Sequence, residues 1–334
     1  MDWSKGYSAS YYMTIVDPVT WRDAERIELV SGSIKRQADG LMQSAEVTCV
    51  NYPTGMERWV RIYLDTVQED GNAHVPLFTG LATSPGEDID GVLRSATVQC
   101  YSVLKPAADM YLLRGWYAPA GVSGGTIIRQ LLGVTNAPVE VADNAPALQS
   151  YIIAENNETY LTMIQRILTA INWRIRIAGD GSISVEPVTD EPVATFDPFA
   201  MDVLETKIKV KADWFSCPNV FMAVDDDLTA IARDDSETSP LSTSNRGREV
   251  WAVDTSCALA DNETIEEYAN RRLKEKQSIR KTAEYDRRFF PDVLPGDMVR
   301  LHYPEQSIDG VFRVKSQSIA LSYAATTSEV VTEE

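Results

Sequence analysis

Residues 59–64 read WVRIYL and residues 45–50 read AEVTCV, so apolar and polar side chains alternate along both stretches. A period of two puts every second side chain on one face of a β-strand, and it predicts strands with one buried face. Similar β-rich stretches lie at residues 9–16, 27–30, 33–35, 74–82 and 93–101. Turn pairs such as Ser31-Gly32 and Asp90-Gly91 separate them. Short strands at this even spacing are typical of a barrel or sandwich, and we assign residues 1–103 to a first β-barrel.

The pattern changes after Lys105-Pro106, where glycines become frequent. Residues 125–132 and the stretch that follows Asn157 have apolar side chains at helical spacing, with Asn157 as the expected N-cap. The sequence WRIRI at residues 173–177, a Gly-Asp-Gly turn and a returning strand then predict a β-hairpin. Residues 104–195 therefore predict a small α/β insert domain.

Strand signals resume in the last third of the chain, which predicts a second β-barrel over residues 196–323. The barrel is expected to carry one long helix at residues 263–281, capped by Asn262 or Thr264, and Glu267 stands where a capping box needs it. Residues 324–334 are polar and are predicted to be a disordered tail. The expected fold class is α+β and mainly β: two tail-tube-like barrels, an inserted α/β domain and one long helix.

The chain has 334 residues and a net charge of −18. A charge of this sign argues against binding to nucleic acid, which requires cations to neutralise phosphates, and against docking on anionic lipid. No apolar run approaches the roughly 18 residues that span a bilayer, so we expect no membrane anchor. The first residues show no basic stretch followed by an apolar one, which predicts no secretory signal and folding in the cytoplasm.

The chain offers little material for catalysis. Its two histidines, His74 and His302, nearly exclude a Ser-His-Asp triad of the usual form and a histidine-rich metal site. Its four cysteines form no C-x-x-C pair and are expected to be free, partly buried thiols; they are Cys49, Cys100, Cys217 and Cys257. We therefore predict a protein that is not an enzyme and needs no cofactor.

Three consecutive aspartates at residues 225–227 resemble the start of a calcium loop. Counted from Asp226 as the first position, the glycine that an EF-hand requires at its sixth position is absent, because Ile231 stands there. An EF-hand is excluded on this ground, while a looser calcium site at residues 225–227 stays open.

Positive charge is concentrated at the end of the predicted long helix. The cluster consists of Arg271, Arg272, Lys274, Lys276, Arg280 and Lys281. Such a run is commonly a solvated helix face. The alternative is a subunit interface, in which the cluster contacts an acidic surface of a neighbouring copy and unlike surfaces meet head to tail.

Several segments resemble the hub family of phage tails, which includes baseplate hub proteins, late-control D proteins and the hub part of secretion-system spikes. Residues 158–168, running into 173–175 and 179–183, are similar to the helix and hairpin of that family's insert domain. Residues 291–301, PDVLPGDMVRL, are similar to its proline-glycine approach to a barrel strand. The helix at 263–281 and the Phe-Thr-Gly strand at residues 77–82 add to the resemblance.

The resemblance implies a structural virion protein located in the tail: a homotrimeric hub at the tail tip or baseplate, with two barrels per subunit in a pseudo-sixfold ring. Implied partners are a distal tail or tail tube protein above the ring, a tape measure protein, and a central spike or tip protein below it. The ring would pass DNA during ejection without binding it specifically. Three copies with a charge of −18 each would carry −54, which repels phosphate if much of it lines the lumen.

Two other interpretations stay open. One is a hexameric distal tail or tube-end protein, which differs from the hub in subunit number. The other belongs to another class: a β-protein that binds or hydrolyses cell-wall carbohydrate. The seven tryptophans are scattered along the chain and do not cluster as sugar-binding platforms would.

Overall fold

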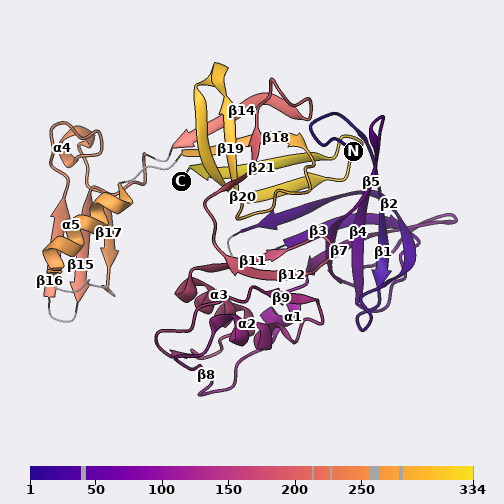
Figure 1. Cartoon of the computed structure of the whole chain (residues 1–334), viewed down its shortest axis with the longest axis horizontal. Coiled ribbons are helices and arrows are strands. Elements are labelled where there is room, and N and C mark those ends of the chain that lie inside the picture. The colour runs from indigo at the N-terminus through magenta and orange to yellow at the C-terminus, as the bar shows by residue number, and fades with distance from the viewer. Residues whose placement is uncertain are drawn as a thin grey trace. The chain divides into compact units, whose positions relative to one another are not determined.

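The computed structural model describes residues 1–38, 43–212, 214–225, 228–255, 257, 263–277 and 281–333. The chain divides into two compact units: unit 1 holds residues 1–208 and 284–331, and unit 2 holds residues 209–283 and 332–334. Strands outnumber helices in the chain (Figure 1), which confirms the mainly β, α+β class that the sequence predicts.

Six antiparallel strands of unit 1 close into a barrel. Their neighbour order is β1-β4-β5-β7-β3-β2, and β2 pairs with β1 again, so that the path returns to its start. Apolar side chains such as Met13, Ile34, Val47, Ile62 and Phe78 have no exposed surface, and they explain the alternation in the sequence. The strands are β1 (Ser8–Val16), β2 (Asp23–Gln37), β3 (Gln43–Val50), β4 (Arg58–Gln68), β5 (Gly71–Ala82), a short β6 (Asp88–Asp90) that pairs with β7, and β7 (Leu93–Ser102).

The insert is a small α/β layer inside unit 1. Helices α2 and α3 share an apolar core with the sheet β11-β12-β9, and β9 runs parallel to β12. Helix α3 begins two residues later than Asn157 predicts: Thr159 is the N-cap, and its hydroxyl accepts the N–H of Thr162 at 3.2 Å. The elements are α1 (Lys105–Asp109), β8 (Tyr117–Ala118), α2 (Gly124–Leu132), β9 (Val139–Val141), β10 (Ile152–Ile153), α3 (Tyr160–Ile171), β11 (Trp173–Ile177) and β12 (Ile183–Pro187).

A second set of six strands follows the order β13-β19-β20-β21-β18-β14. It is joined to the first barrel without a break, because residues 33–37 of the long strand β2 pair with residues 316–320 of β20. Both sets therefore belong to one 13-stranded sheet. The strands are β13 (Pro192–Phe196), β14 (Leu204–Ala212), β18 (Lys281–Arg288), β19 (Met298–Tyr303), β20 (Ile308–Ala320) and β21 (Thr326–Glu333), with a single 3-10 turn at Pro304–Gln306.

The prediction of a disordered tail at residues 324–334 is wrong for residues 326–333, which form strand β21 between β20 and β18. Alternate side chains of this strand are buried: Thr327 and Val331 expose no surface, and Glu329 exposes 1%. Polar composition is misleading here because the buried polar groups have partners inside the fold, which removes most of the cost of burying them.

Unit 2 is a two-layer α/β module. Its sheet has the order β16-β15-β17, and helix α5 covers one face through Phe221, Ala223, Tyr268 and Leu273. Its elements are β15 (Val220–Asp225), β16 (Leu228–Arg233), α4 (Thr243–Arg246), β17 (Trp251–Asp254) and α5 (Ile265–Lys276).

The long helix differs from the expectation in two ways. It is shorter than residues 263–281, and it packs on the sheet of unit 2, whereas the sequence placed it in the second barrel. Thr264 caps it in the predicted capping box with Glu267, and the hydrogen bonds from Thr264 lower the pKa of the Glu267 carboxyl. The other candidate cap, Asn262, lies outside the described residues.

The described part of the chain holds no helix long and apolar enough to cross a membrane. Across the same described residues, no group of three His, Cys, Asp or Glu side chains is arranged to hold a metal ion. The loop at residues 225–227 is not tested by this, because Asp226 and Asp227 lie outside the described residues and Asp225 is described only as the end of β15.

Candidate assembly site

The predicted cationic cluster lies at the end of α5 and the start of β18, and the two arginines within α5 are paired with nearby glutamates. Arg271 binds both carboxylate oxygens of Glu263, at 2.7 and 2.9 Å, and contacts Glu275 at 3.0 Å. Arg272 contacts Glu275 at 2.6 Å. The hydrogen bonds that Arg271 donates to Glu263 and Glu275 raise the pKa of Arg271. These two cations are therefore largely neutralised locally.

The lysines of the cluster are more available. Lys274 and Lys276 are exposed in the last turn of α5, and within the described ranges neither forms an ion pair. Lys281 begins β18, and its Nζ lies 3.8 Å from a carboxylate oxygen of Glu333. Arg280 lies outside the described residues. A role of this cluster in a subunit interface stays a prediction.

A second set of contacts, which no sequence pattern indicates, joins the insert to the rest of unit 1. The turn of the β11–β12 hairpin contacts the first barrel through its backbone carbonyls. Trp21 Nε1 and Arg61 Nη2 donate hydrogen bonds to the carbonyl of Asp180, at 3.1 and 3.0 Å. Thr79 Oγ1 donates to the carbonyl of Gly179 at 2.8 Å. Trp21 of the β1–β2 connection, Arg61 of β4 and Thr79 of β5 thus hold this turn, and we call these contacts the hairpin junction.

Gly179 makes the closest approach in this junction. A Cβ at Gly179 would lie 1.8 Å from the carbonyl oxygen of Pro76, a backbone atom that cannot rotate away. We expect Gly179→Ala to reduce the free energy of unfolding by about 1–3 kcal/mol, because the hairpin or β5 must shift to relieve the overlap. Urea denaturation measures the change. Gly86→Ala is the matched control: no atom lies within 4 Å of its Cβ, so it should cost nothing, and equal losses for both variants would contradict the close contact.

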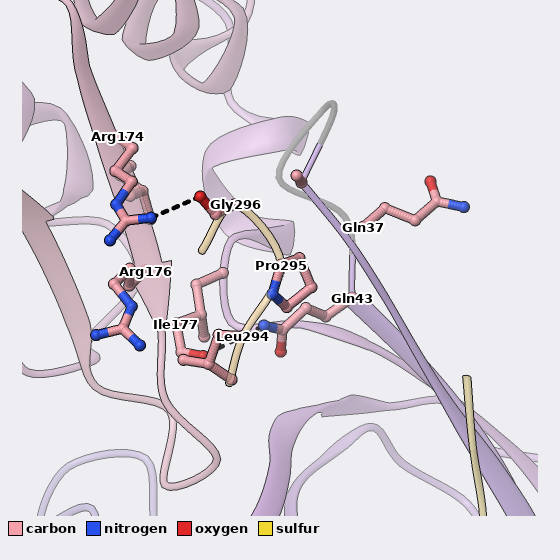
Figure 2. A pocket seen from close by; sticks show the side chains of 10 residues that line it. Gln37, Gln43, Arg174, Arg176, Ile177, Leu294, Pro295 and Gly296 are labelled. Carbon is pink, nitrogen blue, oxygen red and sulfur yellow. Dashed lines mark hydrogen bonds between the residues drawn. The ribbon is translucent and has the colours of Figure 1, made fainter. Parts of the chain in front are cut away.

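Strand β11 contacts the opposite side of unit 1 through one buried carboxylate. Asp297 is fully buried and pairs with Arg174 at 3.0 Å and with Arg176 at 2.9 Å. Its Oδ2 also accepts the backbone N–H of Leu294 at 2.9 Å. Arg174 donates to the carbonyl of Gly296 at 2.7 Å, as the dashed line in Figure 2 marks. The proline-glycine segment of the sequence therefore positions a carboxylate and a carbonyl against β11.

A cavity of about 90 Å³ lies beside these contacts. In Figure 2, Arg174 and Arg176 lie at the left of this lining, Leu294 and Pro295 in the centre, and Gln43 at the right. Ligand-binding pockets usually measure about 300–1,000 Å³, so this cavity has room for a few water molecules and not for a sugar or a nucleotide. We therefore assign it a structural role.

A third set of charged residues is buried between β18, β20 and β21. Arg287 and Glu329 form an ion pair in which neither side chain has any exposed surface. The hydroxyl of Tyr285 and the amide of Gln317 also donate to Glu329, the latter at 2.6 Å. Burial raises the pKa of Tyr285, so its hydroxyl stays protonated as a donor. Glu329 thus accepts three hydrogen bonds inside the protein.

Arg36 of β2 extends this set into the first barrel. Its guanidinium donates to Gln317 Oε1 at 3.5 Å and to the carbonyl of Leu77 in β5. Burial lowers the pKa of Arg36 to about 10, and the positive charge of Arg287 acts in the same direction, so Arg36 remains charged at neutral pH. We call Arg36, Tyr285, Arg287, Gln317 and Glu329 the barrel network.

Part of this network could have been found in the sequence. Ala283, Tyr285 and Arg287 share one face of β18, so a period-of-two analysis places an arginine in an apolar row. No sequence signal identifies Glu329 as its partner, since 42 residues separate the two and the pairing depends on β21 lying beside β18.

The histidines and cysteines show no arrangement for chemistry in the structure. His74 is exposed and His302 is half-buried, and they lie beside carboxylates, at 2.6 Å from Asp65 and 3.5 Å from Asp309. All four cysteines are thiols outside any disulfide, as the sequence predicts. Burial raises the pKa of the Cys49 thiol to about 12, which keeps it protonated and unreactive.

No protein-family model matches the chain. No curated protein matches it either. Solved structures do: a tail protein from Neisseria meningitidis MC58 has a TM-score of 0.66 at 17% identity, over 98% of this chain and 97% of that one. The 43 kDa tail protein of prophage MuSo2 from Shewanella oneidensis has a TM-score of 0.64 at 11% identity, over 96% and 97%. Prophage tail protein gp18 from Listeria monocytogenes has a TM-score of 0.53 at 13% identity, over 97% and 94%.

These three structures match almost end to end, so the likeness covers the barrel, the insert and the remaining strands together. The resemblance that the sequence motifs predict is confirmed at the level of the fold: this chain is folded as a phage tail protein.

Proposed function

We propose that the protein is a structural subunit of a phage or phage-like tail and forms a trimeric hub at the tail tip or baseplate. The observation that carries this proposal is the joining of two six-strand sets in one chain through the β2–β20 pairing. Three such chains place six comparable β-units around an axis, and this number suits a sixfold tail tube or distal tail ring.

The contacts inside unit 1 support a load-transmitting role. The hairpin junction, Asp297 and the barrel network hold the insert and both strand sets by buried hydrogen bonds and ion pairs. Buried hydrogen bonds and ion pairs of this kind oppose displacement of the strands that they join. Such a frame fits a protein that acts by its shape and its contacts, and we propose no enzymatic activity.

The proposed partners follow from this position. Three copies would form the ring as a homotrimer. The ring would contact a distal tail or tail tube protein on one side and a spike or tip protein on the other. A tape measure protein and then DNA would pass through its lumen. The charge of −18 per chain would oppose DNA binding in such a ring. A reconstruction of the ring with a basic lumen would contradict this part of the proposal.

The subunit number tests the proposal directly. Native mass spectrometry of the purified full chain should give the mass of three 37.1 kDa chains. A six-chain assembly would overturn the hub and favour the distal tail or tube-end ring. A protein that stays a single chain at every concentration would overturn both.

A further inference from the structure

The hairpin formed by β6 and β7 exposes apolar side chains at its end. Residues 87–94, which we call the hairpin tip, turn at Gly91, where φ is +61°, and pair Asp90 with Leu93. Val92 is fully exposed, at 101% of the reference surface for valine, and Ile89 and Leu93 expose 61% and 54%. Single exposed apolar residues are ordinary, but three within five positions at the end of a projecting hairpin mark an interaction surface.

The hairpin tip is also acidic. Glu87, Asp88 and Asp90 lie on it, and Arg94 is its single cation, 3.3 Å from Glu87. In the described residues, Asp88 and Asp90 form no ion pair, and both are exposed. A partner for this tip therefore has to offer an apolar floor together with positive charge, since an apolar surface alone would leave two carboxylates partly desolvated without a counter-charge.

Unit 2 offers a surface of that chemistry. A groove of about 400 Å³ opens beside the C-terminal end of α5, and we call it the α5 groove. Its floor includes Pro240, Leu241 and Trp214, the last of which exposes 50% of its surface. Lys281 lines it together with Gln277, the residue that ends α5.

The cations of the predicted cluster lie next to this groove. Lys274 and Lys276 occupy the last turn of α5, directly before Gln277. They are exposed and, within the described residues, have no carboxylate partner, whereas Arg271 and Arg272 already have Glu263 and Glu275. The unpaired positive charge of α5 is therefore at its groove end.

We propose that the hairpin tip of one copy docks in the α5 groove of a neighbouring copy of this chain. Val92 and Ile89 would cover Trp214 and Leu241, and Asp88 and Asp90 would face Lys274 and Lys276. A second copy is the favoured occupant because tip and groove are unlike surfaces of opposite charge on the same chain, and such surfaces build head-to-tail contacts that close into rings. The inference rests on the proposed trimer and names the contact that forms it.

Charge reversal tests the electrostatic half of the contact. Asp88→Lys with Asp90→Lys should raise the concentration at which half of the chains assemble at least tenfold, measured by light scattering after size-exclusion chromatography. Adding Lys274→Glu and Lys276→Glu to the same chain should restore assembly to within about threefold, because the pairs are formed again with exchanged signs. Glu25→Lys with Glu57→Lys is the control: it changes the net charge equally at exposed positions outside residues 87–94 and should assemble as the wild type does.

Disulfide trapping tests the position of the contact without depending on charge. A Val92→Cys chain mixed with a Pro240→Cys chain under mild oxidation should give a cross-linked heterodimer, identified by peptide mass. Val19→Cys is the matched control, since Val19 is a valine with 90% of its surface exposed, and it should give none with Pro240→Cys.

The outcomes separate the two claims. If the wild type is a trimer, charge reversal leaves it unchanged and Val92→Cys does not cross-link, this docking is overturned and the hub stands. If the wild type never forms three-chain assemblies, the hub itself fails. Loss of assembly in the variant with reversed tip charges, and its restoration when Lys274 and Lys276 are also reversed, supports both the docking and the trimeric hub.

Discussion

Replacing Glu329 by alanine is expected to lower the free energy of unfolding by about 3–5 kcal/mol. Glu329 pairs with Arg287 where neither side chain has any exposed surface, and it also accepts hydrogen bonds from Tyr285 and Gln317. Its removal leaves a buried guanidinium without a counter-charge and two buried donors without an acceptor. The positive charge of Arg36 nearby adds repulsion that Glu329 otherwise offsets.

Chemical denaturation followed by tryptophan fluorescence measures this loss, with circular dichroism to confirm that the variant is folded before denaturant is added. Glu333→Ala is the matched control on the same strand. Its partner Lys281 lies 3.8 Å away and both side chains are partly exposed, so this change should cost less than about 1 kcal/mol. A Glu329→Ala variant as stable as Glu333→Ala would show that β21 does not lie against β18 in solution.

The second large effect is expected at Asp297. Asp297→Ala should cost about 3 kcal/mol, at the low end of the range for breaking a buried ion pair, because Arg174 and Arg176 remain partly exposed and can recover some hydration. The two guanidiniums would keep Glu186, at 2.8 Å from Arg174 and 3.8 Å from Arg176, but would lose their buried carboxylate. The backbone N–H of Leu294 would lose its acceptor as well.

The variant should also loosen the insert from the remaining strands, so limited proteolysis near β11 should become faster while the first barrel stays protected. Asp309→Ala is the control, since Asp309 pairs with Arg300 on an exposed part of β20 and should cost less than about 1 kcal/mol. Equal denaturation midpoints for the two variants would contradict a stabilising role of Asp297.

Both predictions concern carboxylates, Glu329 and Asp297, that no sequence pattern assigns to the interior of the protein. An arginine or glutamate in an alternating strand is ordinarily assigned to the solvent face. For Arg287 the alternation itself places the residue on the inner face of β18, beside Ala283 and Tyr285. For Asp297 the neighbouring Pro295 and Gly296 identify a turn, but which side chains its carboxylate faces depends on where the β11–β12 hairpin lies.

The elements of the first barrel and the insert could be derived from local patterns. The WVRIYL stretch forms part of β4, and the WRIRI stretch forms β11 with the hairpin turn where the glycines predict it. Such patterns are sufficient because strand pairing in a hairpin is local and the alternation is produced by a single buried face.

The cationic cluster shows a mixed outcome. Its position at the end of a capped helix followed from Thr264, Glu267 and the charge run. The sequence did not predict which members of the cluster pair with a carboxylate. The hydrogen bond from Arg271 to Glu263 spans eight residues and requires the fold of the preceding segment. The pairing of Lys281 with Glu333 depends on two strands from distant parts of the chain.

The sequence by itself determined that this protein is mainly β, that a small α/β insert interrupts its strands, and that it resembles phage tail hubs. The tertiary structure alone decided that residues 326–333 form a strand, that α5 belongs to a separate unit, and that Glu329 and Asp297 hold buried arginines. The physical reason is the range of the interactions. Strand and helix periodicity arises from neighbours a few residues apart, whereas the cost of burying a charge is offset only by a partner that the complete fold brings within about 3 Å.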